Sequence, residues 1–303
     1  MRITRRQFYS TLAVGSVYPV IVEPRWLEVS RRRVRLEGLR SPVRLLHLSD
    51  FHASFCVPMS IVEHAIREGV AEKPDIICVT GDFITRGEEF ASRDYPTVLR
   101  RLSAVAPTYA VLGNHDGGLW AGVYDGRTDH REVDRLLEDS GIELLHNRST
   151  VVTVRDSVLT LVGTGDLWNE ELDGHRAFEE VTFNTPIVLL SHNPDGKDLV
   201  WRYGWDLMLS GHTHGGQVIF PFLGPSYAPV VDKRYVDGLK DWGTRQIHIS
   251  RGVGNVWGIR FRCRPEVTLL ELVTGKLLET GYMVEPAACL EQNCPQVMWD
   301  LGE

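Results

Sequence analysis

Five short apolar runs, each followed directly by a polar block rich in Asp, Asn and His, constrain the fold of this chain more than any other feature. Apolar runs of this length, bounded by turn residues, are typical of buried strands. In open α/β sheets, ligands bind beyond the carboxyl ends of the strands, and neighbouring strands lie only about 4.8 Å apart. We therefore expect the five polar blocks to converge on one site. The runs are Val43–Leu48, Asp75–Thr80, Thr108–Leu112, Pro186–Leu190 and Leu207–Leu209.

The rest of the chain alternates helical and extended patterns around these runs. Amphipathic stretches predict helices over 60–71, 96–104 and 131–140, and turn residues 155–157 indicate a hairpin. The chain has 303 residues, of which 43% are hydrophobic, so it can bury a sizeable core. The pattern predicts one α/β domain in which two sheets lie between helices. Further strands are expected at Gln246–Ser250 and Glu266–Leu272.

The polar blocks carry the residue types that bind transition metals. In the last block, GHTHGGQ, His212 and His214 stand one residue apart among glycines. Side chains at positions i and i+2 of an extended segment point to the same side, so both histidines can face one point. Glycines let the backbone approach a ligand closely. In chain order the blocks are Ser49–His52, Gly81–Asp82, Gly113–Asp116, Ser191–Asp195 and Gly211–Gln217.

The ordered set D-x-H, G-D, G-N-H-D, H-N-P-D and G-H-T-H-G-G-Q resembles the calcineurin-like metallophosphoesterases, and all five blocks are intact. The resemblance implies a four-layer α-β-β-α sandwich, with two mixed sheets flanked by helices. It implies a metallophosphoesterase domain over residues 41–274, after a signal- or anchor-like segment and basic linker at 1–40 and before a tail at 275–303. The start of the chain and the late RCRPE are similar to a bacterial branch of exported phosphoesterases.

The resemblance also implies a pair of metal ions that share Asp82. Asp50, His52, Asp82 and His214 would hold the first ion, and Asp82, Asn114, His192 and His212 would hold the second. Imidazole mixed with carboxylate or amide oxygen suits Mn, Fe or Zn better than Ca or Mg, and manganese is favoured here. Such a pair would activate a bridging hydroxide for attack on a phosphate ester.

His115 is not a ligand in this scheme. We expect it to protonate the leaving oxygen or to stabilise the phosphate, while Asp116 positions it through a hydrogen bond. The aromatic segments 117–130 and 164–179 are candidate substrate-facing insertions, with ordinary surface loops as the alternative.

The N-terminus resembles a twin-arginine export signal. Thr4–Phe8 contains Arg5 and Arg6 and precedes an apolar stretch that ends at Val22. No good cleavage site follows, so the segment is expected to remain as an anchor on an exported, periplasmic or cell-envelope-associated protein. A basic tail on a cytoplasmic protein is the alternative. The basic cluster at 31–35 is a candidate contact for anionic lipid headgroups.

The composition limits the classes of molecule that the protein is expected to bind. The net charge of -7 argues against a general nucleic-acid binder. Of the five cysteines, Cys289 and Cys294 are close enough in sequence to pair in an oxidising compartment. The expected substrate is a phosphorylated small molecule or a phospholipid-like phosphoester.

Two alternative functions stay open at this point. The first is a UDP-2,3-diacylglucosamine pyrophosphatase of lipid A synthesis, acting at the cytoplasmic membrane face. The second is a metal-binding scaffold without catalysis, although relatives of that kind usually lack a ligand or the His of G-N-H-D, and this chain has all of them.

Overall fold

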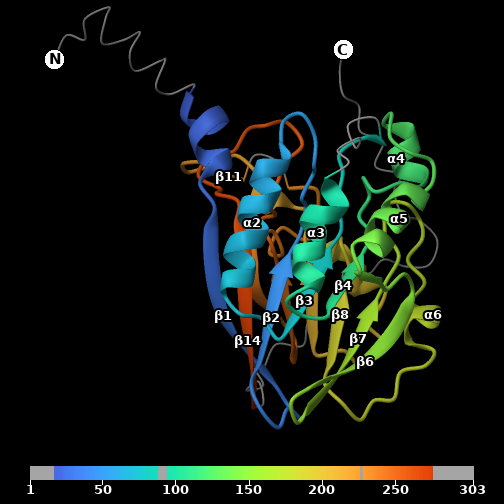
Figure 1. The fold of residues 1–303 in the computed structure, drawn as a ribbon. Coiled ribbons are helices and arrows are strands. Elements are labelled where there is room, and N and C mark those ends of the chain that lie inside the picture. Colours follow the sequence, from blue (N-terminus) through green and yellow to red (C-terminus); the bar gives the residue numbers. More distant parts are fainter. Residues whose placement is uncertain (1–16, 88–93, 226–227, 276–303) are drawn as a thin grey trace, which may run out of the picture.

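Two six-stranded mixed sheets stacked face to face form the centre of the molecule (Figure 1). The computed structural model describes residues 17–87, 94–225 and 228–275. The first sheet has the order β1-β14-β2-β3-β4-β5, and its strands from β2 to β5 run parallel. Its strands are β1 (Glu28–Leu36), β2 (Val43–Leu48), β3 (Ile76–Thr80), β4 (Thr108–Val111), β5 (Glu143–Leu144) and β14 (Glu266–Thr274).

The second sheet has the order β12-β13-β9-β8-β7-β6, with a parallel centre and an antiparallel strand at each edge. A separate two-stranded hairpin is formed by β10 (Ile219–Phe220) and β11 (Gly224–Pro225). The strands of the second sheet are β6 (Arg148–Val154), β7 (Ser157–Gly163), β8 (Ile187–Leu190), β9 (Leu207–Ser210), β12 (Gly238–Trp242) and β13 (Arg245–Ile249).

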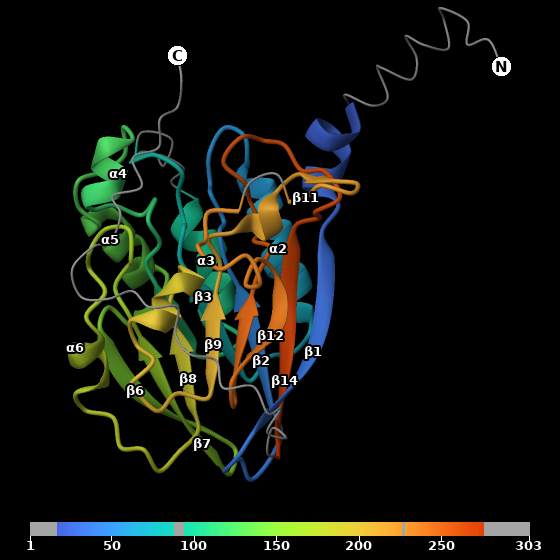
Figure 2. The ribbon, with the colours of Figure 1, turned by 180° about the vertical axis from the view of Figure 1, so that it is seen from behind.

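Helices cover the outer face of the first sheet. These are α2 (Met59–Ala71), α3 (Tyr95–Ser103) and α5 (Arg131–Asp139), and Figures 1 and 2 show them on the side away from the second sheet. Alternation along β2 explains this layering, because Leu46 and Leu48 pack with the helices while Leu45 packs between the sheets.

The outer face of the second sheet is covered more thinly. The short helix α6 (Gly174–Phe178), the 3-10 turn η4 (Pro194–Asp198) and long loops pack there around Trp205 and Trp242. The predicted four-layer sandwich of two mixed sheets between helices is confirmed, with this last layer made largely of loops.

The remaining short elements lie at the upper end of the molecule in Figure 1. They are η1 (Tyr18–Val22), η2 (Glu23–Arg25), α4 (Leu119–Val123) and η5 (His214–Gly216). Among the described helices, none is both long and apolar enough to cross a membrane. The twin-arginine segment and the Cys289–Cys294 pair lie outside the described residues.

Strand β1 has no counterpart among the elements predicted from the sequence. This strand pairs in parallel with β14 and buries Ser30, Val34 and Leu36, whereas the arginines between them are exposed. Because the arginines dominate the segment, it was assigned to a basic linker. In the fold, Arg31 forms a two-pronged hydrogen bond with Glu72 in the turn after α2.

A pair of buried histidines joins the two sheets beneath the strand ends. His47 on β2 and His248 on β13 lie with their Nδ1 atoms 2.8 Å apart, and His47 Nε2 contacts Thr80 Oγ1 at 2.9 Å. Burial, together with the neighbouring ring, lowers the pKa of His47 well below 6.5, and burial lowers the pKa of His248 to about 4. Both rings are therefore neutral in the folded protein near pH 7.

We expect this pair to make the fold acid-sensitive. The unfolded chain takes up these protons near pH 6.5, so the stabilisation is complete above that pH and is lost as the pH falls towards 4. In His248→Gln, the free energy of unfolding should depend less on pH between about 6 and 4.5, by up to about 1.4 kcal/mol per pH unit. Urea unfolding across that range measures the two slopes. Equal slopes would show that His248 does not contribute.

Candidate metal centre

The five polar blocks meet at one end of the molecule. In both sheets the carboxyl ends of the central strands point to the upper end of the views in Figures 1 and 2. The seven predicted ligands are all buried there, none more than 6% exposed. This is the convergence that the sequence predicted.

Four of the predicted ligands form one compact group. Asp50, His52, Asp82 and His214 each offer a ligand atom within 4.8 Å of the others. His52 Nε2 lies 3.1 Å from His214 Nε2 and 3.2 Å from Asp82 Oδ2, and His214 Nε2 lies 3.6 Å from Asp50 Oδ1. These are the residues assigned to the first ion.

The residues assigned to the second ion form a second group on the other side of Asp82. His192 Nε2 lies 3.2 Å from the same Asp82 Oδ2. His212 Nδ1 lies 3.3 Å from His192 Nε2 and 2.8 Å from Asn114 Oδ1. Asp82 therefore stands between the two groups, as the predicted shared ligand would.

The donor set fits divalent transition metals, because a ligand nitrogen must be unprotonated to bind. Burial, together with a neighbouring imidazole in each case, lowers the pKa of His212 and of His214 well below 6.5. His192 donates from Nδ1 to the Thr80 carbonyl at 2.6 Å, and its Nε2 faces Asp82. Burial opposes a charge on His192, but Asp82 and Asp50 raise its pKa to about 10, so an ion bound there would displace that proton. Carboxylates together with imidazole nitrogens form a ligand set typical of Mn, Fe or Zn.

Five of the seven ligands adopt positive φ. They are Asp50 (53°), His52 (46°), Asp82 (55°), His212 (69°) and His214 (50°). Non-glycine residues rarely adopt this left-handed conformation, and such strain concentrates at functional sites. GHTHGG is therefore not the extended segment from which its shared face was inferred. It is a turn, and His214 begins η5.

Glycine is required where these turns touch one another. A Cβ on Gly113 would lie 2.2 Å from Asp82 Oδ1, and a Cβ on Gly211 would lie 2.2 Å from Asp50 Oδ2. Both contacts are closer than real Cβ atoms tolerate. The expectation that glycines allow close approach at this site is confirmed.

His115 borders the two groups, but the contact predicted for Asp116 is wrong. His115 Nδ1 lies 3.0 Å from the carbonyl oxygen of Thr85, which fixes the ring. The Asp116 carboxylate instead accepts hydrogen bonds from backbone N–H groups, at 2.7–3.3 Å. The donating N–H groups belong to Asp82, Phe83, Ile84 and Gly113. Asp116 thus holds the turn at Asp82 against the turn at Gly113.

A family model for the calcineurin-like phosphoesterases matches residues 43–216, which is more than half of the chain. The chain belongs to the calcineurin-like phosphoesterase family. It is a hydrolase of phosphoric ester bonds, and the resemblance stated from its sequence motifs is confirmed.

Relatives support the same assignment for this phosphoesterase. It is 40% identical to phosphodiesterase YaeI of Escherichia coli, over 89% of this chain and all of that protein. It is 27% identical to the uncharacterized metallophosphoesterase YkuE of Bacillus subtilis, over 89% of this chain and 98% of that one. The UDP-2,3-diacylglucosamine pyrophosphatase LpxG of Chlamydia muridarum is more distant, at 26% identity over 82% of this chain and 90% of that protein.

Two aromatic loops of this phosphoesterase border the cluster. The ring of Trp168 meets His212 edge-on, with centroids 4.2 Å apart, and Trp120 meets His115 at 4.8 Å. Asn169 joins the loops, because its Oδ1 accepts from Trp120 N and its Nδ2 donates to the Asn114 carbonyl. Both segments therefore lie beside the cluster, and their contact with substrate stays a prediction.

Arg260 is a site residue that the sequence did not reveal. It is fully buried and donates to the carbonyl oxygens of Arg251, Gly252 and Gly254. The loop that it ties down lies directly against Asp50, whose carbonyl accepts from Gly254 N. A single arginine in an arginine-rich stretch gives no pattern that marks it as buried.

Proposed function

We propose that this phosphoesterase is a phosphodiesterase that works with two divalent transition metal ions. Manganese is the favoured metal, with iron and zinc as the alternatives. Asp50, His52 and His214 would hold one ion, Asn114, His192 and His212 the other, and Asp82 both. The observation that carries the proposal is the position of Asp82 Oδ2, which lies 3.2 Å from Nε2 of both His52 and His192. A pair of divalent ions, when bound, supplies an activated water and stabilises charge on the oxygens of an in-line displacement.

The chain's own residues supply orientation and proton transfer. Two carboxylates and a set of neutral imidazoles leave the loaded centre positively charged, which favours an anionic phosphate. His115 holds its Nδ1 proton on the Thr85 carbonyl, so its Nε2 is the atom left for the phosphate or the leaving oxygen. Burial lowers the pKa of His115 to about 4, and the negative charge of a bound substrate opposes this shift. Trp120 and Trp168 stand beside His115 and His212.

The phosphodiester preference rests on the similarity to the phosphodiesterase YaeI and on the family. The similarity to LpxG, a UDP-2,3-diacylglucosamine pyrophosphatase, supports that activity as the alternative and favours a lipid-like substrate. A catalytically silent scaffold has less support, because every predicted ligand and His115 lie in one cluster. An assay of bis-p-nitrophenyl phosphate hydrolysis with Mn²⁺ tests the scaffold alternative, and turnover would reject it.

For location, we propose an exported protein associated with the cell envelope. The support is the sequence Thr4–Phe8 with its arginine pair and the apolar stretch that follows. The alternative is a peripheral protein on the cytoplasmic face of the inner membrane.

Removal of metal should abolish activity. Chelator treatment is expected to stop the hydrolysis of bis-p-nitrophenyl phosphate, and Mn²⁺ should restore it with two ions bound per chain. Asp82→Ala should lose both ions and about a thousandfold or more in turnover, because metal ions supply several kcal/mol of transition-state stabilisation. Elemental analysis and steady-state rates measure this. Asp139→Asn, at an exposed position at the end of α5, is the control. Two ions retained in Asp82→Ala would contradict the bridging role.

His115→Ala should separate catalysis from folding. It is expected to keep both ions and its Tm while turnover falls a hundredfold or more, the usual scale for acid catalysis.

Asp116→Ala should instead lower the free energy of unfolding by about 3 kcal/mol or more, because buried backbone N–H groups lose their acceptor. Thermal unfolding, metal content and kcat on the two variants test both roles. Full activity of His115→Ala would refute the first.

Export should depend on the arginine pair. Replacing Arg5 and Arg6 by lysine keeps the charge but removes the twin-arginine motif. The variant chain is then expected in the cytoplasm rather than in the envelope fraction. The wild-type chain is expected in the cytoplasm as well when the cells lack a working twin-arginine pathway. Fractionation with immunodetection shows the outcome. An unchanged distribution in both cases would favour the cytoplasmic-face alternative.

A further inference from the structure

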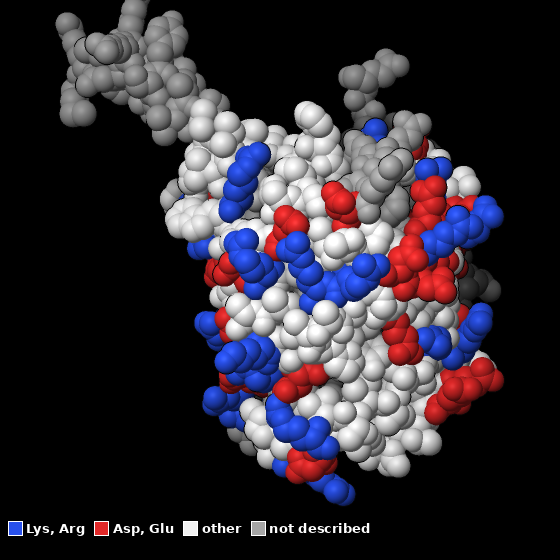
Figure 3. All heavy atoms as spheres, viewed as in Figure 1, with Lys and Arg blue, Asp and Glu red and all other residues white. Residues whose placement is uncertain are grey.

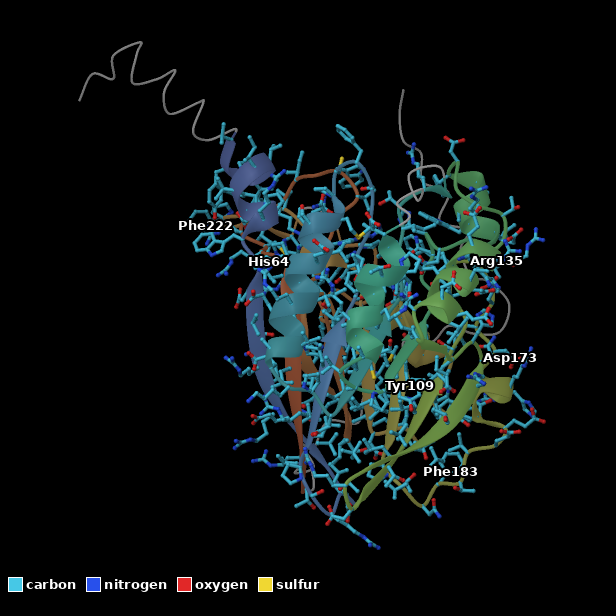
Figure 4. All side chains as sticks on the ribbon, in the orientation of Figure 1. His64, Tyr109, Arg135, Asp173, Phe183 and Phe222 are labelled. Atoms are coloured by element: carbon cyan, nitrogen blue, oxygen red, sulfur yellow. The ribbon has the colours of Figure 1, made fainter. Side chains whose placement is uncertain are left out.

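Large apolar side chains stand exposed at the end of the molecule where the metal-ligand cluster lies. Phe222 is fully exposed at 106%, Phe55 is 92% exposed and Leu223 is 83% exposed. Figure 4 shows Phe222 pointing away from the body beside the N-terminal helix. Large exposed apolar patches are rare on soluble proteins and mark interaction sites. We name this set the apolar rim: Val20, Ile21, Phe55, Phe220, Phe222, Leu223 and Ile259.

Four separate chain segments build the apolar rim, and contacts join them into one surface. The η1 segment meets the loop before β14 where Arg260 N donates to the Pro19 carbonyl at 2.8 Å. That loop meets the β10–β11 hairpin where Ile219 N donates to the Phe261 carbonyl at 2.9 Å. A Cβ on Gly258 would lie 3.5 Å from Cys56, next to Phe55.

The apolar rim borders the first-ion group. Phe55 follows His52 by three residues, and the β10–β11 hairpin begins five residues after His214. The carbonyl of Gln217, which ends the GHTHGGQ turn, accepts from Phe261 N at 3.0 Å. In Figure 1, η1 and β11 lie at the same upper end as the carboxyl ends of the strands. A surface that covers the apolar rim would therefore lie beside the ligands.

The chemistry of the apolar rim fits a lipid surface better than a protein groove or partner. Its most exposed side chains stand on two loops, Phe55 on one and Phe222 with Leu223 on the turn between β10 and β11. Aromatic and aliphatic side chains on such loops suit the boundary between headgroups and acyl chains. The chain enters the structure at this point, since η1 follows residues 8–16, FYSTLAVGS, and the arginines before them. Arg264 lies 4.4 Å from the ring centroid of the half-exposed Trp26. In Figure 3 the upper left of the surface, where η1 lies, is mostly uncharged.

We propose that the apolar rim docks on a lipid bilayer and holds the metal-ligand cluster at the depth of the headgroup phosphates. The substrate class that follows is a phosphoester carried by a membrane lipid. This substrate class rests on the proposed function, whereas the docking does not.

The test compares the full wild-type chain with two triple variants on vesicles of phosphatidylethanolamine and phosphatidylglycerol. The rim variant is Phe55→Ser with Phe222→Ser and Leu223→Ser. The matched control is Val151→Ser with Phe183→Ser and Leu199→Ser, exposed positions away from the apolar rim. Phe183 lies near the lower end of the molecule in Figure 4. Cosedimentation should show a partition coefficient at least tenfold lower for the rim variant and unchanged for the control.

Activity is measured in parallel on two substrates with Mn²⁺. On soluble bis-p-nitrophenyl phosphate all three proteins should have equal kcat/KM, because the rim variant touches no ligand. On an acylated p-nitrophenyl phosphodiester embedded in the vesicles, the rim variant should lose tenfold or more. Binding without any hydrolysis would reject the proposed function and keep the docking surface.

Two results overturn the proposal. The first is a rim variant that sediments with vesicles as well as the wild type does, since residues outside the apolar rim would then carry the binding. The second is a wild-type chain that stays in solution. If that chain instead forms dimers that the rim substitutions break, the apolar rim is a protein interface.

Discussion

The active end of this phosphoesterase depends on a single carboxylate, that of Asp82, placed between histidines from two different sheets. His52 follows β2 in the first sheet and His192 follows β8 in the second, and Asp82 Oδ2 lies 3.2 Å from each. The stacking of the two sheets is what brings these strand ends together. A buried carboxylate is costly unless it is paired with positive charge. His192, whose pKa its carboxylate neighbours raise to about 10 against the effect of burial, supplies that charge, and bound cations would replace it.

The same arrangement imposes strain that the surroundings must support. Asp50, Asp82 and His212 adopt left-handed backbone conformations, and the turns that carry them touch through glycines. Backbone hydrogen bonds to Asp116 on one side and from Arg260 on the other hold these turns. Neither residue needs to touch substrate to matter. They fix the ligand geometry, which a dinuclear site requires to within fractions of an ångström.

Much of the fold and of the ligand set could be predicted from the sequence, because buried strands ended by polar blocks leave a local pattern. What could not be predicted depends on contacts between distant segments. The strand β1 was missed because its exposed arginines hid the apolar alternation of Val34 and Leu36. His115 makes its hydrogen bond with the backbone carbonyl of Thr85. Every residue has such a carbonyl, so the sequence does not indicate which one accepts the bond. Asp116 was assigned to His115 because they are adjacent in sequence, but adjacent side chains on a turn point in different directions.

The apolar rim went unnoticed for a related reason. Each of its segments is short and looks ordinary, and only the fold joins them, through contacts such as Arg260 N with the Pro19 carbonyl and Ile219 N with the Phe261 carbonyl. Its position also gives the two ligand groups different neighbours. The first-ion group lies beside the apolar rim through His52 and His214, whereas the second lies beside the aromatic loops through His212 and Trp168. The two sides of Asp82 are thus unlike, with an apolar surface near one and flat aromatic rings near the other. The proposed docking would place the bilayer on the side of the apolar rim and leave the aromatic loops on the other side.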